Sequence, residues 1–202
     1  MSILNVFITP EEGLVGVDTE SVMPDGSIHE AGKMIAVPAA GAVIAFRGTD
    51  YVLMAASPSL VCFGGTLEQL AEWIPDLFRQ SFDYCRTHYQ ATEEALGMDL
   101  ALVGYSEAEE RVVGHLFRRA IDSEEIRADR IHTRYRSPLW SEEDLPPGIP
   151  ADRPGMIALA QHQSRLARER MPEFAAGGRF LIAEVRRHSI SIEKALDFPP
   201  RQ

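Results

Sequence analysis

This sequence of 202 residues has no long apolar run, very few cysteines and no excess of positive charge. No apolar run approaches the roughly 18 residues of a membrane-spanning helix, so we expect no membrane span. Only two cysteines are present, Cys62 and Cys85, which argues against a disulfide framework and makes a reducing cytoplasm the expected location. The formal net charge of −10 argues against nucleic acid as a partner, because phosphate binding depends on lysine and arginine.

Signals for metals, cofactors and secretion are equally scarce. The six histidines show no metal-ligand spacing, and the glycine pairs at 64–65 and 177–178 are too sparse for a phosphate-binding loop. We therefore expect neither a metal nor a cofactor. The N-terminus lacks the basic segment and apolar core of a secretory signal. The arginine-rich segment at 118–136 is diluted by acidic residues, which favours a solvated face or a subunit contact.

The first half of the chain changes from strand patterns to helical patterns. Short apolar segments bounded by glycine, proline or aspartate predict strands at 2–9, 13–19, 33–37 and 41–47. A short helix is expected at 49–56, ending before Ser57 and Pro58. A long helix is expected at 66–89, because its apolar residues recur at helical spacing and Thr66 with Gln69 fits a capping box. Pro75 is expected to kink or split this helix.

The second half returns to strands around one more helix. We expect a hairpin at 99–118, a proline-rich loop at 141–154, a helix at 156–170 and the last strands at 180–196. Residues 197–202 are expected to be a flexible tail. With 45% hydrophobic residues the chain can bury one sizeable core, so the pattern predicts a single α+β domain over 1–202.

Ser2, Asp18 and Lys33 are the candidate catalytic residues. If Met1 is removed, the α-amine of Ser2, with an ordinary pKa of roughly 7.7 to 8.0, can act as the base that activates its own hydroxyl. A nearby Lys33 would lower the pKa of that amine by charge repulsion, and Asp18 would hold Lys33 charged and oriented. The expected reaction is amide hydrolysis through an acyl ester on Ser2.

The segment from Ser2 to Asp50 resembles the opening of proteasome β-type subunits and their bacterial relatives, which are N-terminal-nucleophile (Ntn) hydrolases. Asp18 follows Ser2 at the family's interval, and Lys33 follows it at one residue less. The matching segments are Ser2–Phe7, Gly13–Thr19, Lys33–Val37 and Arg47–Asp50, with weaker matches at 100–117 and 176–182. The resemblance implies a four-layer αββα sandwich of two antiparallel sheets over the whole chain. It also implies a peptide or amide substrate and self-association into a ring or smaller oligomer, and it leaves an ATPase partner open.

Several residues depart from the family pattern. The nucleophile position holds Ser2 where the most similar families have threonine. Arg47, followed by Gly48, stands at the turn whose backbone N–H forms the family's oxyanion hole and where a glycine is usual. The family's accessory aspartate falls on Glu173, and its accessory serine falls on Ala176. The shell around the three catalytic positions is therefore altered.

Other interpretations of the same residues stay open. Ser2 is an ordinary second residue, Asp18 can cap a turn, and Lys33 after Gly32 can be solvated. Arg47 and Gly48 also suit a plain strand-to-helix turn. The departures favour a second hypothesis, a catalytically inactive protein of the same fold with a structural or assembly role. A third hypothesis is an unrelated α+β protein that binds a small molecule.

Overall fold

Groups of strands and groups of helices follow one another along the chain in the computed structural model, which describes residues 2–22, 27–121, 123–138, 148–171 and 176–200. The described residues form three α-helices and three antiparallel sheets, so the expected mixture of helices and antiparallel strands is confirmed. The helices are α1 (Asp50–Val61), α2 (Leu67–Tyr89) and α3 (Arg153–Arg170), with short 3-10 helices η1 (Pro38–Ala40) and η2 (Glu93–Leu96).

The strands form two five-stranded sheets and one separate pair. The first sheet has the order β10-β1-β2-β11-β12, with the bounds Arg134–Ser137, Leu4–Ile8, Gly13–Asp18, Arg179–Arg186 and Ser189–Asp197. The second sheet has the order β5-β6-β7-β8-β9, with the bounds Met34–Val37, Ala42–Gly48, Met98–Ser106, Arg111–Arg119 and Arg127–Ile131. The separate pair is β3 (Glu20–Val22) with β4 (Ile28–Glu30).

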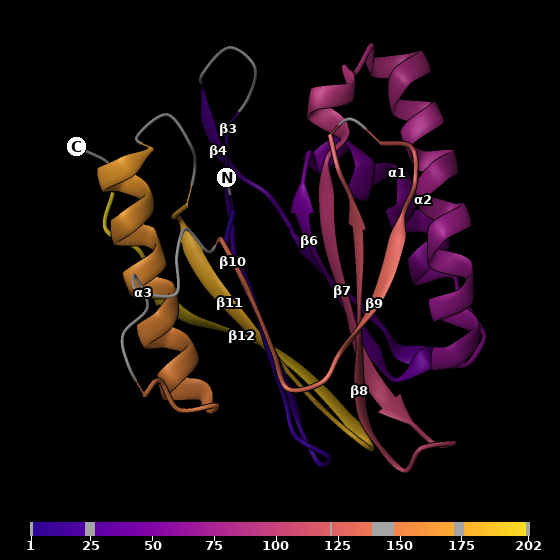
Figure 1. Cartoon of the computed structure of the whole chain (residues 1–202), viewed down its shortest axis with the longest axis vertical. Coiled ribbons are helices and arrows are strands. Elements are labelled where there is room, and N and C mark those ends of the chain that lie inside the picture. Colours follow the sequence, from indigo (N-terminus) through magenta and orange to yellow (C-terminus); the bar gives the residue numbers. More distant parts are fainter. Residues whose placement is uncertain (1, 23–26, 122, 139–147, 172–175, 201–202) are drawn as a thin grey trace.

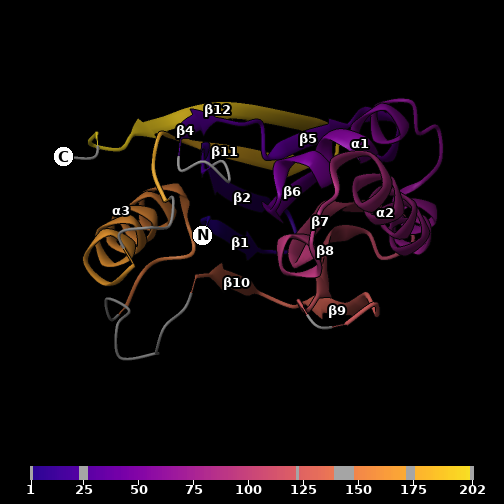
Figure 2. The ribbon, with the colours of Figure 1, turned by 90° about the horizontal axis from the view of Figure 1, so that it is seen from above.

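The two five-stranded sheets face each other, and helices cover their outer faces (Figures 1 and 2). Helices α1 and α2 pack on the second sheet through a buried cluster that contains Phe46 and Phe78. Helix α3 packs on the first sheet through a cluster that contains Met156 and Phe180. Valine and alanine side chains of β2, β6 and β7 fill the space between the sheets. Strands β1 and β2 are therefore buried on both faces, which explains their nearly continuous apolar sequences.

Helix α2 begins where the sequence predicts. The Thr66 hydroxyl accepts a hydrogen bond from the Gln69 N–H at 3.3 Å, and the Gln69 side chain accepts one from the Thr66 N–H at 2.9 Å. This capping box satisfies two of the backbone donors that a helix start leaves unpaired. Pro75 lies inside the helix without dividing it into two.

Helix α1 is longer than the sequence predicts, so the expected end before Ser57 and Pro58 is wrong. The helix continues through Pro58, although proline cannot donate the usual backbone hydrogen bond. Burial explains the continuation, because Leu60 is fully buried and packs in the same core cluster as Leu53 and Ala56. The Ser57 hydroxyl donates to the Leu53 carbonyl at 2.6 Å, which adds a local hydrogen bond beside the proline.

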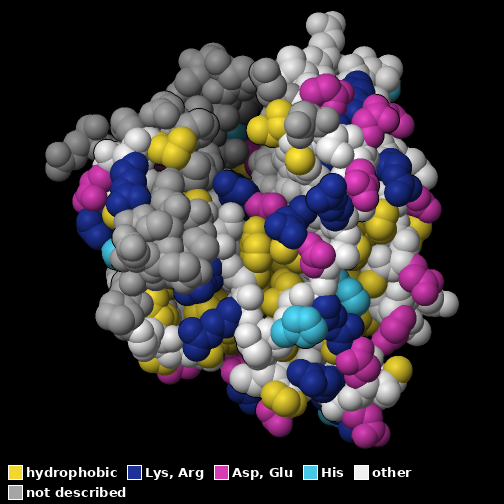
Figure 3. All heavy atoms as spheres, viewed as in Figure 1, with side chains coloured by type: hydrophobic (Ala, Val, Ile, Leu, Met, Phe, Trp, Pro, Cys, Tyr) yellow, Lys and Arg dark blue, Asp and Glu magenta, His cyan; other side chains and the backbone are white. Residues whose placement is uncertain are grey.

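Four strands were not expected from the sequence: β3, β4, β9 and β10. They are short and polar, so they lack the apolar alternation that indicates a strand. Strands β9 and β10 occupy the arginine-rich segment, where Arg118 pairs with Asp129, and Arg130 pairs with Glu109. On the molecular face of Figure 3, basic and acidic side chains likewise intermingle. The arginines therefore meet carboxylates instead of forming a purely basic patch.

The C-terminal elements begin and end differently from the expected ranges. Helix α3 starts before residue 156, because Asp152 caps it by accepting a hydrogen bond from the Gly155 N–H at 2.8 Å. Of the expected loop at 141–154, residues 141–147 lie outside the described residues. The expected tail begins with packed residues: Asp197 ends β12, and the buried Phe198 lies edge-on to Phe180. Within the described residues, no helix is both long and apolar enough to cross a membrane.

Candidate active site

Ser2 lies just before β1, which belongs to the first sheet together with β2 and β11. Its side chain has little access to solvent, since the residue is only 8% exposed. The next residue fixes the backbone, because the Ile3 N–H donates to Asp18 Oδ1 at 2.8 Å. The position of Ser2 is therefore set from the neighbouring strand as well as from its own.

Asp18 is the last residue of β2 and is fully buried. Besides the Ile3 N–H, its carboxylate accepts a hydrogen bond from the Gly177 N–H at 3.1 Å. Burial raises the pKa of Asp18 above its ordinary value, and the Lys33 charge and the two backbone N–H groups oppose that rise. The Gly177 N–H, just before β11, is thus a hydrogen-bond donor to Asp18. This contact could not be predicted from the sequence, because a backbone N–H is present at almost every residue.

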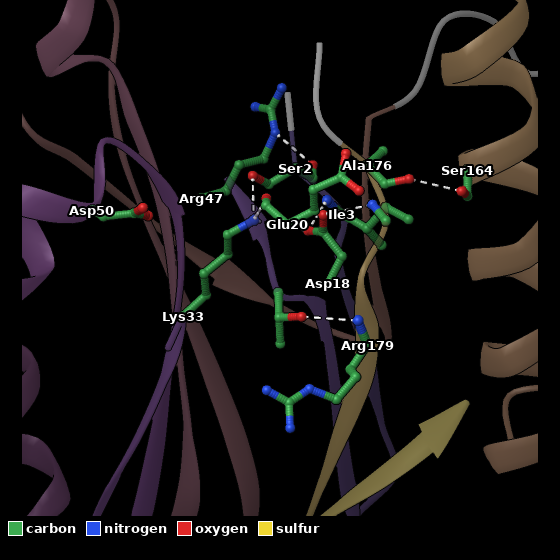
Figure 4. A network of polar contacts seen from close by, with 12 residues as sticks. Ser2, Ile3, Asp18, Glu20, Lys33, Arg47, Asp50, Ser164, Ala176 and Arg179 are labelled. Carbon is green, nitrogen blue, oxygen red and sulfur yellow. Dashed lines mark hydrogen bonds and ion pairs between the residues drawn. The ribbon is translucent and has the colours of Figure 1, made fainter. Parts of the chain in front are cut away.

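Lys33 lies just before β5 and is 1% exposed. Its backbone is fixed to the second sheet, because the Lys33 carbonyl accepts a hydrogen bond from the Phe46 N–H at 2.8 Å. Its Nζ donates to Ser2 Oγ at 2.9 Å, to Asp18 Oδ1 at 3.3 Å and to the Glu20 carbonyl (Figure 4). The three N–H groups of an ammonium thus find three acceptors, which is the condition for burying a charged lysine.

The structure therefore brings together Ser2, Asp18 and Lys33, which lie on two different sheets. Hydrogen bonding to a cation favours the ionised form of a hydroxyl, and a buried position strengthens that effect. The arrangement can therefore stabilise negative charge on Ser2 Oγ. The Lys33 contact also restricts the orientation of the Ser2 hydroxyl. Among the described residues, no group of three or more histidine, cysteine, aspartate or glutamate side chains could hold a metal ion.

Arg47 and Gly48 are the last two residues of β6, so the expected turn begins after them. The Arg47 side chain reaches the candidate site, because its Nε donates to the Ser2 carbonyl at 3.0 Å. Gly48 has no room for a side chain: an added Cβ would lie 2.7 Å from the Phe46 ring and 2.9 Å from the Gly97 carbonyl. The sequence signal at Arg47 was its place in the family pattern, and its side-chain contact with Ser2 could not be predicted from that pattern.

The two accessory positions have different outcomes. Glu173 lies outside the described residues. Ala176 is buried beside the site, and its carbonyl accepts a hydrogen bond from the Ser164 hydroxyl of α3 at 2.7 Å. Ser164 thus anchors the segment that presents the Gly177 N–H to Asp18. Sequence reasoning missed Ser164, whose small polar side chain among the buried residues of α3 was the available signal.

Asp99 and Tyr135 form a second group of residues that the sequence did not indicate. Arg47 Nη1 lies 2.6 Å from Asp99 Oδ2, and the Asp99 carboxylate is near enough to the Tyr135 phenol to help raise its pKa. A pocket of about 530 Å³ opens at Asp99 and is also lined by Arg118 and Arg127. The polar Asp99 near the start of an otherwise apolar strand was the signal that could have found this group.

Comparisons with known proteins agree with the fold. No protein-family model matches the chain, and no curated protein sequence matches it. A solved structure of an Anbu (Gly-1) mutant from Hyphomicrobium sp. strain MC1 has a TM-score of 0.66 and 11% identity, covering 98% of this chain and 89% of that one. Anbu (ancestral beta-subunit) from Yersinia bercovieri has a TM-score of 0.66 and 9% identity, covering 96% and 86%. At these identities the likeness shows that the chain shares the fold of these two structures, and nothing more.

Proposed function

We propose that this chain is a single-domain Ntn hydrolase that cleaves peptide or amide bonds with Ser2 as its nucleophile. In this proposal the two facing sheets and their outer helices are the four-layer αββα sandwich of that fold. Removal of Met1 exposes the α-amine of Ser2, which then serves as the general base. Lys33 and Asp18 complete the catalytic group, and Arg47 with Gly48 forms the edge that meets the substrate carbonyl.

The contact between Lys33 Nζ and Ser2 Oγ carries this proposal. The two atoms are 2.9 Å apart, and Lys33 is also 3.3 Å from Asp18. A buried lysine and a buried aspartate are costly to keep in a protein interior, and apolar residues of similar size are often at least as stable there. Their presence beside a serine hydroxyl is therefore better explained by chemistry than by stability.

The proposed reaction follows from these groups. The neutral α-amine accepts the hydroxyl proton as Ser2 Oγ attacks the substrate carbonyl carbon. The resulting tetrahedral intermediate collapses when the amide C–N bond breaks, the leaving amine takes up the proton, and an acyl ester remains on Ser2. Water then attacks the ester while the α-amine accepts the water proton. The bond between the acyl carbon and Ser2 Oγ breaks, the α-amine returns that proton to Oγ, and the acid product leaves. A positive charge on Lys33, held beside Asp18, would lower the pKa of the neighbouring α-amine by charge repulsion and so favour its neutral form.

Assembly and partners form a second part of the proposal. One of the similar structures is described as an ancestral beta-subunit, which supports self-association of this chain into a ring or smaller oligomer in the cytoplasm. The pocket at Asp99, the carboxylate that pairs with Arg47, gives room for a polar segment of a peptide substrate. An ATPase that delivers substrates stays a hypothesis that follows from the family alone.

One contact favours the alternative function, a catalytically inactive protein with a structural or assembly role. The Arg47 guanidinium occupies space next to the Ser2 carbonyl, where a glycine would leave room for a substrate. Ala176 likewise stands where the family has an accessory serine. Both hypotheses share the fold and differ in whether Ser2 reacts.

Acylation of Ser2 distinguishes the two hypotheses. We would treat protein purified from its native host with a β-lactone and measure its intact mass. The hydrolase predicts loss of Met1 and one adduct, which disappears in Ser2→Ala and Lys33→Ala. The exposed Ser191 offers a matched control, so Ser191→Ala should keep the adduct. Retained Met1 without any adduct, or an adduct that survives in Ser2→Ala, would contradict the hydrolase.

A further inference from the structure

Arg47 connects the nucleophile residue to a carboxylate on the neighbouring strand. Its Nε donates to the Ser2 carbonyl at 3.0 Å, and its Nη1 donates to Asp99 Oδ2 at 2.6 Å. Arg47 and Asp99 are directly opposite each other in the pairing of β6 with β7. The side chains of such a cross-strand pair are held close by the sheet itself, so Asp99 has a fixed place from which to orient the guanidinium.

Tyr135 reaches Asp99 from the other sheet. It belongs to β10, which pairs with β1, and its cross-strand partner is Val6. Burial is the main reason that the pKa of Tyr135 is raised to about 12, and the nearby Asp99 carboxylate is the second. The phenol therefore stays protonated at neutral pH, with the Asp99 carboxylate as a close neighbour from the facing sheet.

Two hydrogen bonds link the nucleophile residue to the second sheet, one from Arg47 to the Ser2 carbonyl and one from Arg47 to Asp99. An arginine side chain has several rotatable bonds, so a single hydrogen bond to a carbonyl holds it poorly. A carboxylate fixed on the other side of the guanidinium removes most of that freedom.

Three contacts thus fix Ser2 and the start of the next residue. Lys33 contacts its hydroxyl, Asp18 contacts the following N–H, and Arg47 contacts its carbonyl. The first two contacts belong to the proposed catalytic group. The third orients the peptide plane from which the side chain and the α-amine project, and small errors in such an orientation reduce reaction rates strongly.

We propose that Asp99 is a positioning residue that acts on Ser2 through Arg47. This inference rests on the proposed function for its effect on rate, but the contacts themselves can be measured without any reaction. Asp99 fixes the guanidinium. Because the action passes through one side chain, Asp99 has no effect of its own once Arg47 is removed.

A double-mutant cycle on the β-lactone acylation rate tests this path. We expect Asp99→Asn to slow acylation about tenfold. In an Arg47→Gln background, Asp99→Asn should change the rate by less than about twofold. The matched control is Asp129→Asn, which removes another cross-strand aspartate paired with an arginine of the second sheet and should leave the rate unchanged. Effects of Asp99→Asn and Arg47→Gln that multiply would overturn the proposal.

A second measurement separates this proposal from the hydrolase itself. The Arg47 Nε–H signal, observed by NMR, should exchange with solvent slowly in the unmodified protein and at least about tenfold faster in Asp99→Asn. Equal exchange in the two proteins would overturn the positioning role, whatever Ser2 does. Slow exchange that depends on Asp99 in a protein that is never acylated would refute the hydrolase and leave the contact path intact.

Discussion

Replacing Lys33 with methionine tests whether charge holds the candidate site together. Lys33 and Asp18 are 1% and 0% exposed, and their Nζ and Oδ1 atoms are 3.3 Å apart. Solvent water therefore does not screen the interaction between these two groups. Removing one partner of a buried ion pair leaves the other uncompensated, which costs about 3 to 5 kcal/mol. Methionine fills a similar volume, so little of that loss comes from a cavity. We expect the free energy of unfolding to fall by about 3 to 5 kcal/mol at pH 7.

The loss should depend on pH in a defined direction. Burial raises the pKa of Asp18 from its ordinary 3.8, and Lys33 opposes that rise. Without Lys33 the pKa in the folded protein is higher still, while in the unfolded chain it stays ordinary. The folded variant then keeps a proton that the unfolded chain releases, so its stability falls as the pH rises from 3.8 through the folded pKa. Each additional unit of pKa widens the gap to the unmodified protein by about 1.4 kcal/mol.

Urea denaturation at several values between pH 5 and pH 8 measures this dependence. The control is Lys194→Met, which removes an exposed lysine whose Nζ lies 2.8 Å from Asp197. An exposed pair is screened by water, so the control should lose less than about 1 kcal/mol. A loss in Lys33→Met that is as small as the control's, or that is the same at every pH, would refute the reasoning.

Three further predictions concern the fold around the site. The Cβ of Gly13→Ala would lie 2.6 Å from a valine methyl of the facing sheet, so urea denaturation should show a loss of about 1 to 3 kcal/mol. The control is Gly32→Ala, whose Cβ would meet nothing within 4 Å and which should change stability by less than about 0.5 kcal/mol. Equal losses in Gly13→Ala and Gly32→Ala would contradict the close approach of the two sheets at Gly13. Thr66→Ala should cost about 1 kcal/mol in thermal unfolding, which Thr66→Ser should largely restore; no loss would mean that the capping box does not stabilise α2. Hydrogen bonds from Arg86, the largest cause, and from Arg119 lower the pKa of Glu93 from 4.5 to about 2. The ionised carboxylate therefore stabilises the folded protein above pH 4.5, and this contribution is lost as the pH falls towards 2. Glu93→Gln should flatten this acid limb of the unfolding profile, and an unchanged limb would contradict the assignment.

Local signals explain which parts of the fold the sequence could predict. Thr66 and Gln69 are three residues apart, so their capping box is visible without any knowledge of the tertiary structure. The end of α1 could not be predicted, because burial of Leu60 against the second sheet overrides the proline at position 58. The strands β9 and β10 were missed for a related reason. Pairing with β8 and β1 stabilises them, while their own sequences are polar.

The candidate site likewise contains some residues that the sequence could indicate and some contacts that it could not. Ser2, Asp18 and Lys33 are far apart in the chain, and only their place in a family pattern indicated that they meet. The contacts of Asp99 and Tyr135 depend on strand register and on how the two sheets face each other. Neither property can be worked out from residue spacing. The contact between Arg47 and the Ser2 carbonyl was missed because the pattern describes the backbone at that position and not the side chain.

The most direct test compares two forms of the protein, one beginning at Ser2 and one that keeps an N-terminal methionine. Each would be treated with the same β-lactone, and the adduct would be located by fragmentation mass spectrometry. Our account predicts an ester on Ser2 in the first form and none in the second, because only a free α-amine can accept the hydroxyl proton. Equal labelling of both forms, or labelling of neither, would contradict the claim that Ser2 acts as an N-terminal nucleophile.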